Sequence, residues 1–542
     1  MTDLLQKLRD FLAENGADAI LINSTNEFLT EYNDTAQNSR AKLTGFTGST
    51  GDCLVTKTQA FLFVDPRYHE QADKEVDLSK FTVVKLAGAY RLSETIVSKL
   101  NKSDVLLLVS TKNSHNFCEA VESFHKNVKY IDFDPLDELN VAEKVRAEVV
   151  PVEICRYDAE MKKEKIVAKL PANTTVAFTS PEDVSYFTNL RCFKYPYSSS
   201  VRAKILLNSQ IANFYTDMLV PELPYTVKPL SEFANDLDSL TEGQLLVDTA
   251  NINQHDFMHI NSGIKVKPAA LFSEKSEKNP SEIRHIISAF EATDRVMAKV
   301  DSFISENDDI SELDLYNAIE KFFRLEGAKG LSFNSITASG KNTSVIHFTH
   351  PDENKKIQNG DLVLVDIGGF FEGGFATDIT RTFVKGMPDE KQKKVYTKVL
   401  KAFIAAYTAE YTKDTTWYEV DKVARFAMEE SDGYVFSHAL GHGIGLSVHE
   451  NPPICAPSPK CIKKFKKNYV FSIEPGLYKA GENGVRLETA VYVKSVSPKF
   501  VLSALSHYKF EEKLINTAML TEKELKFLEA WQKNGNQLRR KP

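Results

Sequence analysis

The chain of 542 residues is long enough for three or four domains of ordinary size. Hydrophobic residues make up 42% of it, charged residues 26% and aromatic residues 10%, a composition typical of globular proteins and not of disordered ones. Its net charge of −7 includes no basic block, so we expect no nucleic-acid partner.

The cysteine content and the lack of long apolar runs predict a cytoplasmic protein. The chain holds six cysteines and no CxxC pair, so we expect neither a disulfide framework nor a thiolate zinc site. The first 18 residues are charged throughout and lack the basic start and apolar run of a secretory signal. Because no 18 successive residues are apolar, we also expect no membrane-spanning helix and no membrane partner.

The N-terminal half alternates helical and strand-like patterns. Helical spacing of apolar residues predicts a first amphipathic helix that buries Leu4, Leu5, Leu8, Phe11 and Leu12. Apolar runs that predict buried strands follow at residues 19–22, 60–64, 81–86 and 105–109. A similar alternation begins again near residue 156. We therefore predict two successive α/β domains, residues 1–155 and 156–277.

A polar stretch at residues 273–282 separates these domains from the C-terminal region. The helix predicted after it carries one apolar stripe, formed by Ile283, Ile286, Ile287, Phe290, Met297, Val300 and Ile304. Residues 278–542 are then predicted to form one larger domain, so the fold class expected for the chain is α/β (α+β). The histidines, acids and glycines that could carry chemistry are concentrated in this last domain.

A first β-hairpin, predicted at residues 360–386, carries two aspartates. Asp366 lies in a buried strand, Glu372 lies in the turn, and Asp378 begins the returning strand. A turn centred on Glu372 would place the aspartates opposite each other, with Cβ atoms about 5 Å apart. Two buried carboxylates so close repel each other unless a cation lies between them, which favours a divalent metal. The alternative is that one aspartate is an exposed turn residue.

A second hairpin is predicted from the β-rich runs 469–478 and 484–493. Glu474 and Glu488 lie 14 residues apart in it, an even spacing that allows both to face one side. Their neighbours are apolar strand residues, and a buried carboxylate without a partner is rare. These two glutamates are therefore further candidate metal ligands.

Five histidines add to the acidic set. His438, His442 and His449 alternate with glycines, which argue against a helix and for a backbone that another group approaches closely. His347 and His350 lie in a β-like run. One histidine on an apolar strand is more often a core residue than a ligand, but three within twelve residues favour a functional site.

The ordered set Asp366, Asp378, His442, Glu474 and Glu488 resembles the five-ligand, two-metal site of the pita-bread metallopeptidases. The local sequences VDIGG, TDITRT, GHGIG, VHE, SIEPGLY and VRLE are also similar to motifs of that superfamily. It includes methionine aminopeptidase, aminopeptidase P and prolidase, alongside the metal-free creatinase. The resemblance implies two creatinase-like N-terminal α/β domains followed by a pita-bread catalytic domain.

Motifs outside the site are similar to the three-domain aminopeptidase P branch. Residues 43–55, 63–68 and 182–191 resemble its first two domains, and residues 509–531 resemble its C-terminal extension. The short gap between the two glutamates also looks like that branch, since prolidases carry a longer insertion there. The resemblance therefore covers nearly the whole chain.

The spacing of the two aspartates departs from the family. Asp366 and Asp378 are 12 residues apart, where the family usually has 11. We expect a β-bulge to absorb the extra residue. A shifted strand register would instead turn Asp378 away from the site.

The resemblance implies how the ligands are shared. Asp366 would bind one metal ion, His442 and Glu474 the other, and Asp378 and Glu488 would bridge the two. Glu474 would also be the general base. An oxygen-rich set of this kind suits Mn²⁺, with Co²⁺ or Zn²⁺ as alternatives.

The remaining residues take substrate roles by resemblance. His449 would hydrogen-bond the scissile carbonyl, and His347 and His438 would flank the proline of the substrate. Arg486 would contact the metal ligands and hold them in place, and it is also expected to contribute to substrate binding. His350 has no counterpart in the family and is expected in a surface loop.

The implied activity is hydrolysis of the N-terminal Xaa–Pro bond of peptides by a hydroxide activated between two metal ions. Proline nitrogen carries no N–H, so peptidases that need that donor fail at this bond. The expected partners are peptides with proline at position 2 and a second copy of the chain in a homodimer. The alternatives are a prolidase restricted to Xaa-Pro dipeptides and a non-catalytic pita-bread module that binds peptides.

Overall fold

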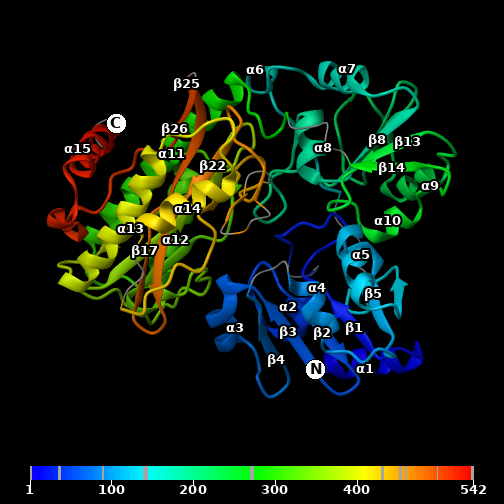
Figure 1. Ribbon diagram of the computed structural model, residues 1–542, viewed down its shortest axis with the longest axis horizontal. Helices are drawn as coiled ribbons and strands as arrows, with labels where there is room; N and C mark the ends of the chain where they lie inside the picture. Colours follow the sequence, from blue (N-terminus) through cyan, green and yellow to red (C-terminus); the bar gives the residue numbers. More distant parts are fainter. Residues whose placement is uncertain are drawn as a thin grey trace. The chain divides into compact units, whose positions relative to one another are not determined.

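The computed structural model of the chain describes residues 3–34, 38–87, 91–137, 144–268, 274–428, 432–450, 454–456, 458, 461–496 and 498–538. The chain forms two compact units. The first comprises residues 1–150, 157–196 and 200–272, and the second comprises residues 151–156, 197–199 and 273–542. Both mix helices and strands, which confirms the predicted fold class (Figure 1). The division of the first unit at residue 155 stays a prediction.

The first unit contains a six-stranded sheet built from the apolar runs near the N-terminus. Its strand order is β4-β3-β2-β1-β5-β6. The strands are β1 (Ala19–Ile22), β2 (Asp52–Thr56), β3 (Ala60–Val64), β4 (Thr82–Lys85), β5 (Leu106–Val109) and β6 (Val128–Ile131). The central strand β1 is parallel to β5 and antiparallel to β2. All four runs predicted as strands in this region are confirmed.

Helices cover this sheet on both faces, which explains why β1 is apolar at every position. They are α1 (Leu4–Glu14), α2 (Ser39–Thr44), α3 (His69–Glu75), α4 (Leu92–Val97) and α5 (His115–Phe124). Leu8 and Leu12 of α1 pack with Ile20 in one core cluster, and Val121 of α5 packs with Leu21 in another. Because successive side chains of a strand point to opposite faces, a strand buried on both sides needs apolar residues throughout.

The second sheet of this unit also has six strands, in the order β12-β11-β10-β8-β13-β14. They are β8 (Thr174–Phe178), β10 (Lys204–Leu207), β11 (Ala212–Tyr215), β12 (Thr226–Lys228), β13 (Gln244–Val247) and β14 (Lys265–Pro268). The accompanying helices are α7 (Ala159–Lys169), α8 (Pro181–Thr188), α9 (Phe233–Asp238) and α10 (Gln254–Met258). A short antiparallel pair, β7 (Glu148–Val149) and β9 (Leu190–Arg191), joins the regions of the two sheets. The renewed α/β alternation after residue 156 is therefore confirmed.

The second unit has two halves, and the first is a three-stranded antiparallel sheet with two long helices. The strands are β16 (Ile336–Ser339), β17 (Leu362–Ile367) and β19 (Ile379–Val384), with β15 (Gly330–Leu331) and β18 (Gly369–Phe370) beside them. The helices are α11 (Pro280–Glu306) and α12 (Glu312–Leu325). Val300 of α11, Ile319 of α12 and Val365 of β17 share one core. The predicted stripe of α11 is buried except for Ile287, which is half-buried.

The second half repeats this plan with other elements. Its sheet consists of β22 (Val470–Ile473), β25 (Thr489–Val496) and β26 (Lys499–Ala504), and its helices are α13 (Glu390–Thr408), α14 (Trp417–Ala427) and α15 (Glu522–Leu538). Short strands complete it: β20 (Gly441–His442), β21 (Ile454–Cys455), β23 (Gly476–Lys479) and β24 (Asn483–Arg486). Phe403, Val420 and Phe471 lie in its core. The halves meet where Thr382 of β19 exchanges hydrogen bonds with Arg486 of β24, which matches the predicted pita-bread architecture.

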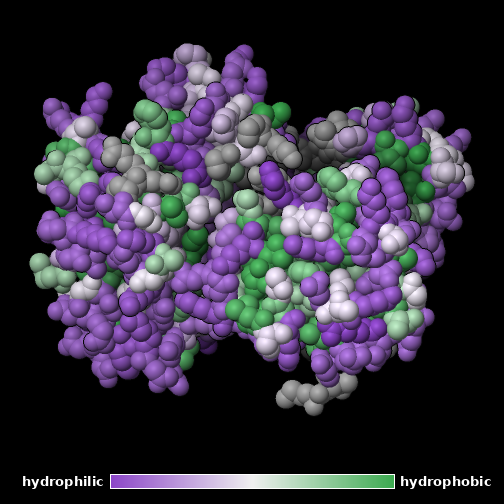
Figure 2. All heavy atoms as spheres, turned by 60° about the horizontal axis from the view of Figure 1, so that its bottom comes forward, coloured by the Kyte–Doolittle hydropathy of each residue, from purple (hydrophilic) through white to green (hydrophobic). Residues whose placement is uncertain are grey.

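The surface and the cysteines agree with the composition. The face drawn in Figure 2 is mainly hydrophilic, with hydrophobic side chains in scattered groups. None of the described helices combines the length and the apolar composition that crossing a bilayer requires. All six cysteines lie among the described residues, and no two of them form a disulfide there.

Candidate metal centre

Asp366 and Asp378 come from neighbouring antiparallel segments of the first half. The register of β17 and β19 pairs Asp366 with Thr380, so the prediction that the two aspartates are directly opposite is wrong. Asp378 lies two residues before Thr380, and the period-two alternation of strands places it on the same face, diagonally across from Asp366. The two carboxylates therefore still converge.

The twelve-residue spacing is accommodated in the turn. The ladder between β17 and β19 ends at the pair Ile367 and Ile379, and an isolated β-bridge pairs Phe370 with Ala376. Two residues separate the bridge from the ladder on each strand, so the register is unchanged. The predicted β-bulge is therefore wrong, and the extra length lies in the turn of residues 371–375. Gly373 and Gly374 adopt positive φ values of 91° and 74° there, a conformation that glycine reaches without steric cost. Equal residue counts on both strands keep the two aspartates on one face.

Glu474 and Glu488 face each other across the second hairpin. β22 pairs with β25, and β23 pairs with β24, in one continuous register that sets the two glutamates opposite each other. The backbone N–H of Glu474 donates to Leu440 at 2.8 Å, and that of Glu488 donates to Thr380 at 3.1 Å. The predicted hairpin is confirmed, and it is hydrogen-bonded to the chain before His442 and to β19.

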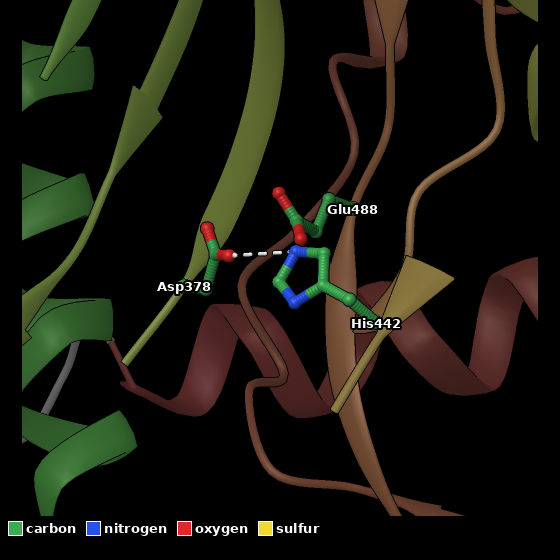
Figure 3. Close-up of side chains that lie close together, drawn as sticks. All are labelled: Asp378, His442 and Glu488. Atoms are coloured by element: carbon green, nitrogen blue, oxygen red, sulfur yellow. Dashed lines mark ion pairs between the residues drawn. The ribbon is translucent and has the colours of Figure 1, made fainter. Parts of the chain in front are cut away.

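His442 on β20 joins the acids of the two hairpins. Its Nε2 lies 3.5 Å from Oδ2 of Asp378 and 3.3 Å from Oε1 of Glu474. Asp378, His442 and Glu488 each offer one atom that could bind a metal, and these three atoms lie within 4.8 Å of one another. Figure 3 shows these three side chains pointing toward one another from three separate segments of the chain.

Burial and mutual repulsion raise the pKa values of the acids. Burial, followed by the charges of Glu488, Asp366 and Glu474, raises the pKa of Asp378 well above its usual range. Burial and the charges of Glu474 and Asp366 do the same to the pKa of Glu488. Burial also raises the pKa of Glu474 to about 7, against the lowering effect of Arg486. All three shifts show that the site disfavours so many negative charges in the absence of a cation.

Two oxygens of the cluster lack hydrogen-bond donors. Among the described residues, nothing donates to the buried Oδ1 of Asp366 or to the buried Oε1 of Glu488. A carboxylate oxygen away from water is costly unless it is paired or coordinates a metal. Four carboxylates and one imidazole are an oxygen-rich donor set that suits divalent first-row metals. The residues present therefore fit a metal centre.

Arg486 contacts the other oxygen of Asp366. Its Nη2 donates to Oδ2 of Asp366 at 2.6 Å, and its Nε donates to Oγ1 of Thr380 at 3.1 Å. Thr380 in turn donates to Oε2 of Glu488 at 2.7 Å. The guanidinium side chain is only 1% exposed, so these bonds are shielded from water. The contacts support the role predicted for Arg486, which orients ligands without completing their coordination.

Tyr478 belongs to the site but was not among the predicted residues. Its Oη lies 2.9 Å from Nη1 of Arg486 and 2.9 Å from Nε2 of His438. Because a guanidinium only donates, Oη accepts from Arg486, and with a neutral imidazole it donates its single proton to Nε2 of His438. Nδ1 of His438 then carries the other proton and donates to the carbonyl of Ala439 at 2.7 Å. The tyrosine ends the SIEPGLY motif, which was the signal that could have identified it.

His449 lies beside His442. The centroids of the two rings are 4.5 Å apart, and the angle between the ring planes is 89°. The charge of His449 is also among the influences that lower the pKa of Glu474, against the dominant effect of burial. The role of His449 at the substrate carbonyl stays a prediction.

The segment of His347 and His350 differs from its prediction. Residues 340–344 form a 3₁₀ helix, and residues 345–350, all described, form no strand, so the predicted β-like run is wrong. The carbonyl of Ile346 accepts from Nη1 of Arg486 at 3.1 Å, which brings the backbone of His347 next to the site. The substrate role of His347 stays a prediction. His350 is exposed, as expected.

Close approach of another group is confirmed at two of the glycines near His442, Gly441 and Gly445. A Cβ at Gly441 would lie 1.9 Å from the carbonyl oxygen of Ser472, and one at Gly445 would lie 2.0 Å from the carboxylate of Glu450. No side chain fits at either position.

A buried cluster of acids and one imidazole, set between two antiparallel hairpins of a two-halved domain, is the arrangement of a metal-dependent hydrolase. Residues 284–495 match the family described as Metallopeptidase family M24, and residues 5–147 match the Creatinase/Prolidase N-terminal domain. The region of residues 284–495 therefore belongs to metallopeptidase family M24, and the chain is a peptidase.

The chain is similar to curated relatives over nearly its whole length. A probable Xaa-Pro aminopeptidase P of Laccaria bicolor is 26% identical over 98% of this chain and 89% of the relative. The X-prolyl aminopeptidase from Caenorhabditis elegans, whose structure is described as that of a cytosolic enzyme with a di-nuclear active site, superposes with a TM-score of 0.91 at 21% identity. That match covers 99% of this chain and 96% of the other, and it shows the fold.

A prolidase structure matches a smaller part of the chain. The recombinant prolidase from Thermococcus sibiricus is 28% identical, with a TM-score of 0.51 over 64% of this chain and 95% of its own.

Proposed function

We propose that the chain is a metalloaminopeptidase that hydrolyses the N-terminal Xaa–Pro bond of peptides. The observation that carries the proposal is the convergence of Asp378, His442 and Glu488 within 4.8 Å, beside buried carboxylate oxygens that lack donors. The names of the relatives that match over 98% of the chain supply the substrate class.

The predicted ligand set would hold two divalent ions, with Mn²⁺ expected and Co²⁺ or Zn²⁺ as alternatives. It consists of Asp366, Asp378, His442, Glu474 and Glu488. Bound there, the ions would make a water molecule acidic enough to lose a proton near pH 7 and so supply hydroxide to attack a carbonyl.

The residues of the chain would then move protons and orient the peptide. Glu474 is the candidate general base, since its carboxylate lies within the cluster, 3.3 Å from Nε2 of His442. His449 would donate a hydrogen bond to the scissile carbonyl oxygen as negative charge develops on it. His347 and His438 would contact the proline, with the ring of His438 held by Tyr478.

A dipeptide and a tripeptide distinguish this activity from that of a prolidase. We expect the Mn²⁺-loaded protein to release arginine from Arg-Pro-Pro faster than from Arg-Pro, because an aminopeptidase admits residues beyond the proline. Cleavage of the dipeptide alone would instead assign the chain as a prolidase. The names of the relatives that match over 98% of this chain favour the aminopeptidase.

A non-catalytic peptide-binding module is the other alternative. Relatives that lost catalysis typically lose ligands, whereas all five positions here carry ligand-type side chains. Metal analysis of the purified protein separates the two cases, because a module without a metal centre would contain no divalent ion.

We also propose that the chain acts in the cytoplasm as a homodimer. The lack of disulfides among its six cysteines agrees with a reducing compartment. Sedimentation equilibrium of the purified chain tests the dimer, and a mass of one chain, 61.0 kDa, would contradict it.

A further inference from the structure

The three histidines of the site lie on a segment with little regular structure. We call residues 438–449 the histidine segment. Its only strand is β20, which spans two residues, Gly441 and His442. A backbone with so few ladder hydrogen bonds does not fix its side chains by itself, so other contacts have to hold it.

A buried ion pair stands at the C-terminal end of the histidine segment. Nζ of Lys278 donates to Oε1 of Glu450 at 2.5 Å, and the two side chains are only 1% and 3% exposed. Nζ also donates to the carbonyl of Lys275. The backbone N–H of Lys278 donates to the carbonyl of Asn468, at 3.2 Å. The lysine is thus anchored on both its side chain and its backbone.

Glu450 closes the histidine segment on itself. Its Oε2 accepts the backbone N–H of Leu446 at 2.9 Å, while its own N–H donates to the carbonyl of Gly443 at 2.8 Å. The carboxylate occupies the space that a side chain at Gly445 would need. His449 is the residue directly before Glu450, so the carboxylate determines where the backbone of that imidazole lies.

A second ion pair stands at the N-terminal end of the histidine segment. On α14, Arg425 donates to both oxygens of Asp421, at 2.6 and 3.2 Å, and the side chain of Asp421 is 0% exposed. The same guanidinium donates to the carbonyl of His438 at 2.5 Å, and Asp421 accepts the backbone N–H of Leu440 at 3.1 Å. The pair therefore fixes the backbone on both sides of Ala439.

Neither pair belongs to the predicted ligand set, yet the two pairs bond directly to the backbone on either side of His442. A buried ion pair gives little net stability, because removing two charges from water costs about as much as their attraction returns. Breaking one, in contrast, leaves an uncompensated charge and shifts the groups bonded to it. Such pairs are better suited to fixing a geometry than to stabilising a fold.

We propose that Asp421–Arg425 and Lys278–Glu450 are positioning pairs that hold the histidine segment at both ends and so set His442 and His449 for metal and substrate. The inference rests on the proposed function for the identity of the site. The set of functional residues then extends beyond the hairpins to Asp421 and Arg425 on α14 and to Lys278, which directly precedes the N-cap residue of α11.

Metal affinity of K278M and R425M tests the proposal without relying on activity. Loss of a contact that orients ligands typically weakens metal binding or activity by about 10–100-fold. We expect calorimetric titration with Mn²⁺ to show a loss of that size in both variants, and Xaa–Pro cleavage to fall in kcat. K278R keeps the charge and should recover most of the Mn²⁺ affinity, whereas R425K keeps the charge without the bidentate geometry and should recover only part of it.

K112M is the matched control. Lys112 and Asp134 form an equally buried pair in the first unit, with side chains 5% and 0% exposed. K112M should lower thermal stability and leave Mn²⁺ affinity unchanged. If K278M does not fold, E450Q gives the same test, because its amide oxygen can still accept from Leu446.

One result would overturn the positioning role, and a different result would overturn the proposed function. Wild-type Mn²⁺ affinity in K278M and R425M, with stability lowered as in K112M, would overturn the positioning role. A wild-type protein that binds Mn²⁺ but cleaves no Xaa–Pro peptide would overturn the proposed function and leave the affinity test of the positioning pairs intact.

Discussion

A single phenolic oxygen connects the ligand-orienting arginine to a predicted substrate histidine. Tyr478 accepts from Arg486 and donates to His438, and burial raises the pKa of the tyrosine to about 12, so it stays protonated at neutral pH. With a neutral imidazole, the tyrosine proton leaves the ring proton of His438 on Nδ1, next to the carbonyl of Ala439. The orientation of the histidine depends on the same arginine that bonds Asp366.

Replacing Tyr478 by phenylalanine should lower both stability and activity. Y478F leaves a donor of Arg486 and an acceptor of His438 unsatisfied, at an expected cost of about 1–3 kcal/mol in the free energy of unfolding. Denaturant unfolding and peptide kinetics measure the two effects. Y434F is the control, because Tyr434 is equally buried and donates to Asn483 away from the ligands. Equal losses of kcat/KM in both variants would contradict the assigned role of Tyr478.

The raised pKa values of the acids predict how the metal-free protein responds to pH. Glu474 has a pKa of about 7 in the folded state against an ordinary value of 4.5, so its contribution to stability is complete below 4.5 and is lost as the pH rises through 7. The pKa values of Asp378 and Glu488 are raised in the same direction. The melting temperature in the presence of a chelator should fall over this interval.

Mn²⁺ should reverse that loss, because the cation replaces the protons that the acids release. The gain in melting temperature on adding Mn²⁺ is expected to grow with pH. E474Q carries no charge at this position and should lose less stability than the wild type as the pH rises. A metal-free melting temperature that climbs between pH 4.5 and 7 would contradict the assigned pKa shift of Glu474.

At the scale of elements, the site depends on the register of two hairpins. Between the ladder of β17 and β19 and the turn, both strands have the same number of residues. The number of residues between Asp378 and the ladder therefore determines the face on which Asp378 lies. A change of one residue in the turn leaves this count untouched, whereas a change of one residue within the strand reverses the face.

A deletion and an insertion test that dependence. Removing Glu372 shortens the turn and should preserve Mn²⁺ binding, because the ladder on either side is unchanged. Inserting alanine between Asp378 and Ile379 should abolish binding, because Asp378 then points to the opposite face. Calorimetric titration measures both, and equal Mn²⁺ affinities in the two variants would rule out control by register.

The strands and the convergence of Asp378, His442 and Glu488 could be predicted from the sequence, but the register of the strands could not. The apolar runs at residues 19–22 and 60–64 coincide with β1 and β3, since burial on both faces leaves an unmistakable pattern. The pairing of Asp366 with Thr380 was missed because turn length alone does not determine which residues pair. Lys278 was not singled out because its partner Glu450 lies 172 residues away, and local patterns carry no such information.

At the scale of the whole molecule, the C-terminal tail is joined through Arg381 to the hairpins that carry the predicted metal ligands. This guanidinium is fully buried and donates to the carbonyls of Glu488 and Tyr508 at 2.5 Å each. Trp531 of α15 donates to the same carbonyl of Tyr508 at 3.1 Å and packs in the core of the second half. The extension expected from the sequence is thus an integral part of the catalytic unit.

Truncating Trp531 should destabilise the protein without removing a ligand. W531A leaves a cavity beside Phe403 and Phe510, at an expected cost of about 3–5 kcal/mol in the free energy of unfolding. Denaturant titration gives this value. A loss below about 1 kcal/mol would show that α15 is only loosely attached.

The central claim is that a dinuclear centre built from Asp366, Asp378, His442, Glu474 and Glu488 cleaves Xaa–Pro bonds. The most direct measurement is mass-spectrometric mapping of the products formed from Arg-Pro-Pro by the metal-depleted protein after addition of Mn²⁺, Co²⁺ or Zn²⁺. We predict release of free arginine that requires a divalent ion, is fastest with Mn²⁺, and falls by orders of magnitude in H442A. An intact tripeptide with every ion, in protein shown to contain bound metal, would contradict the account.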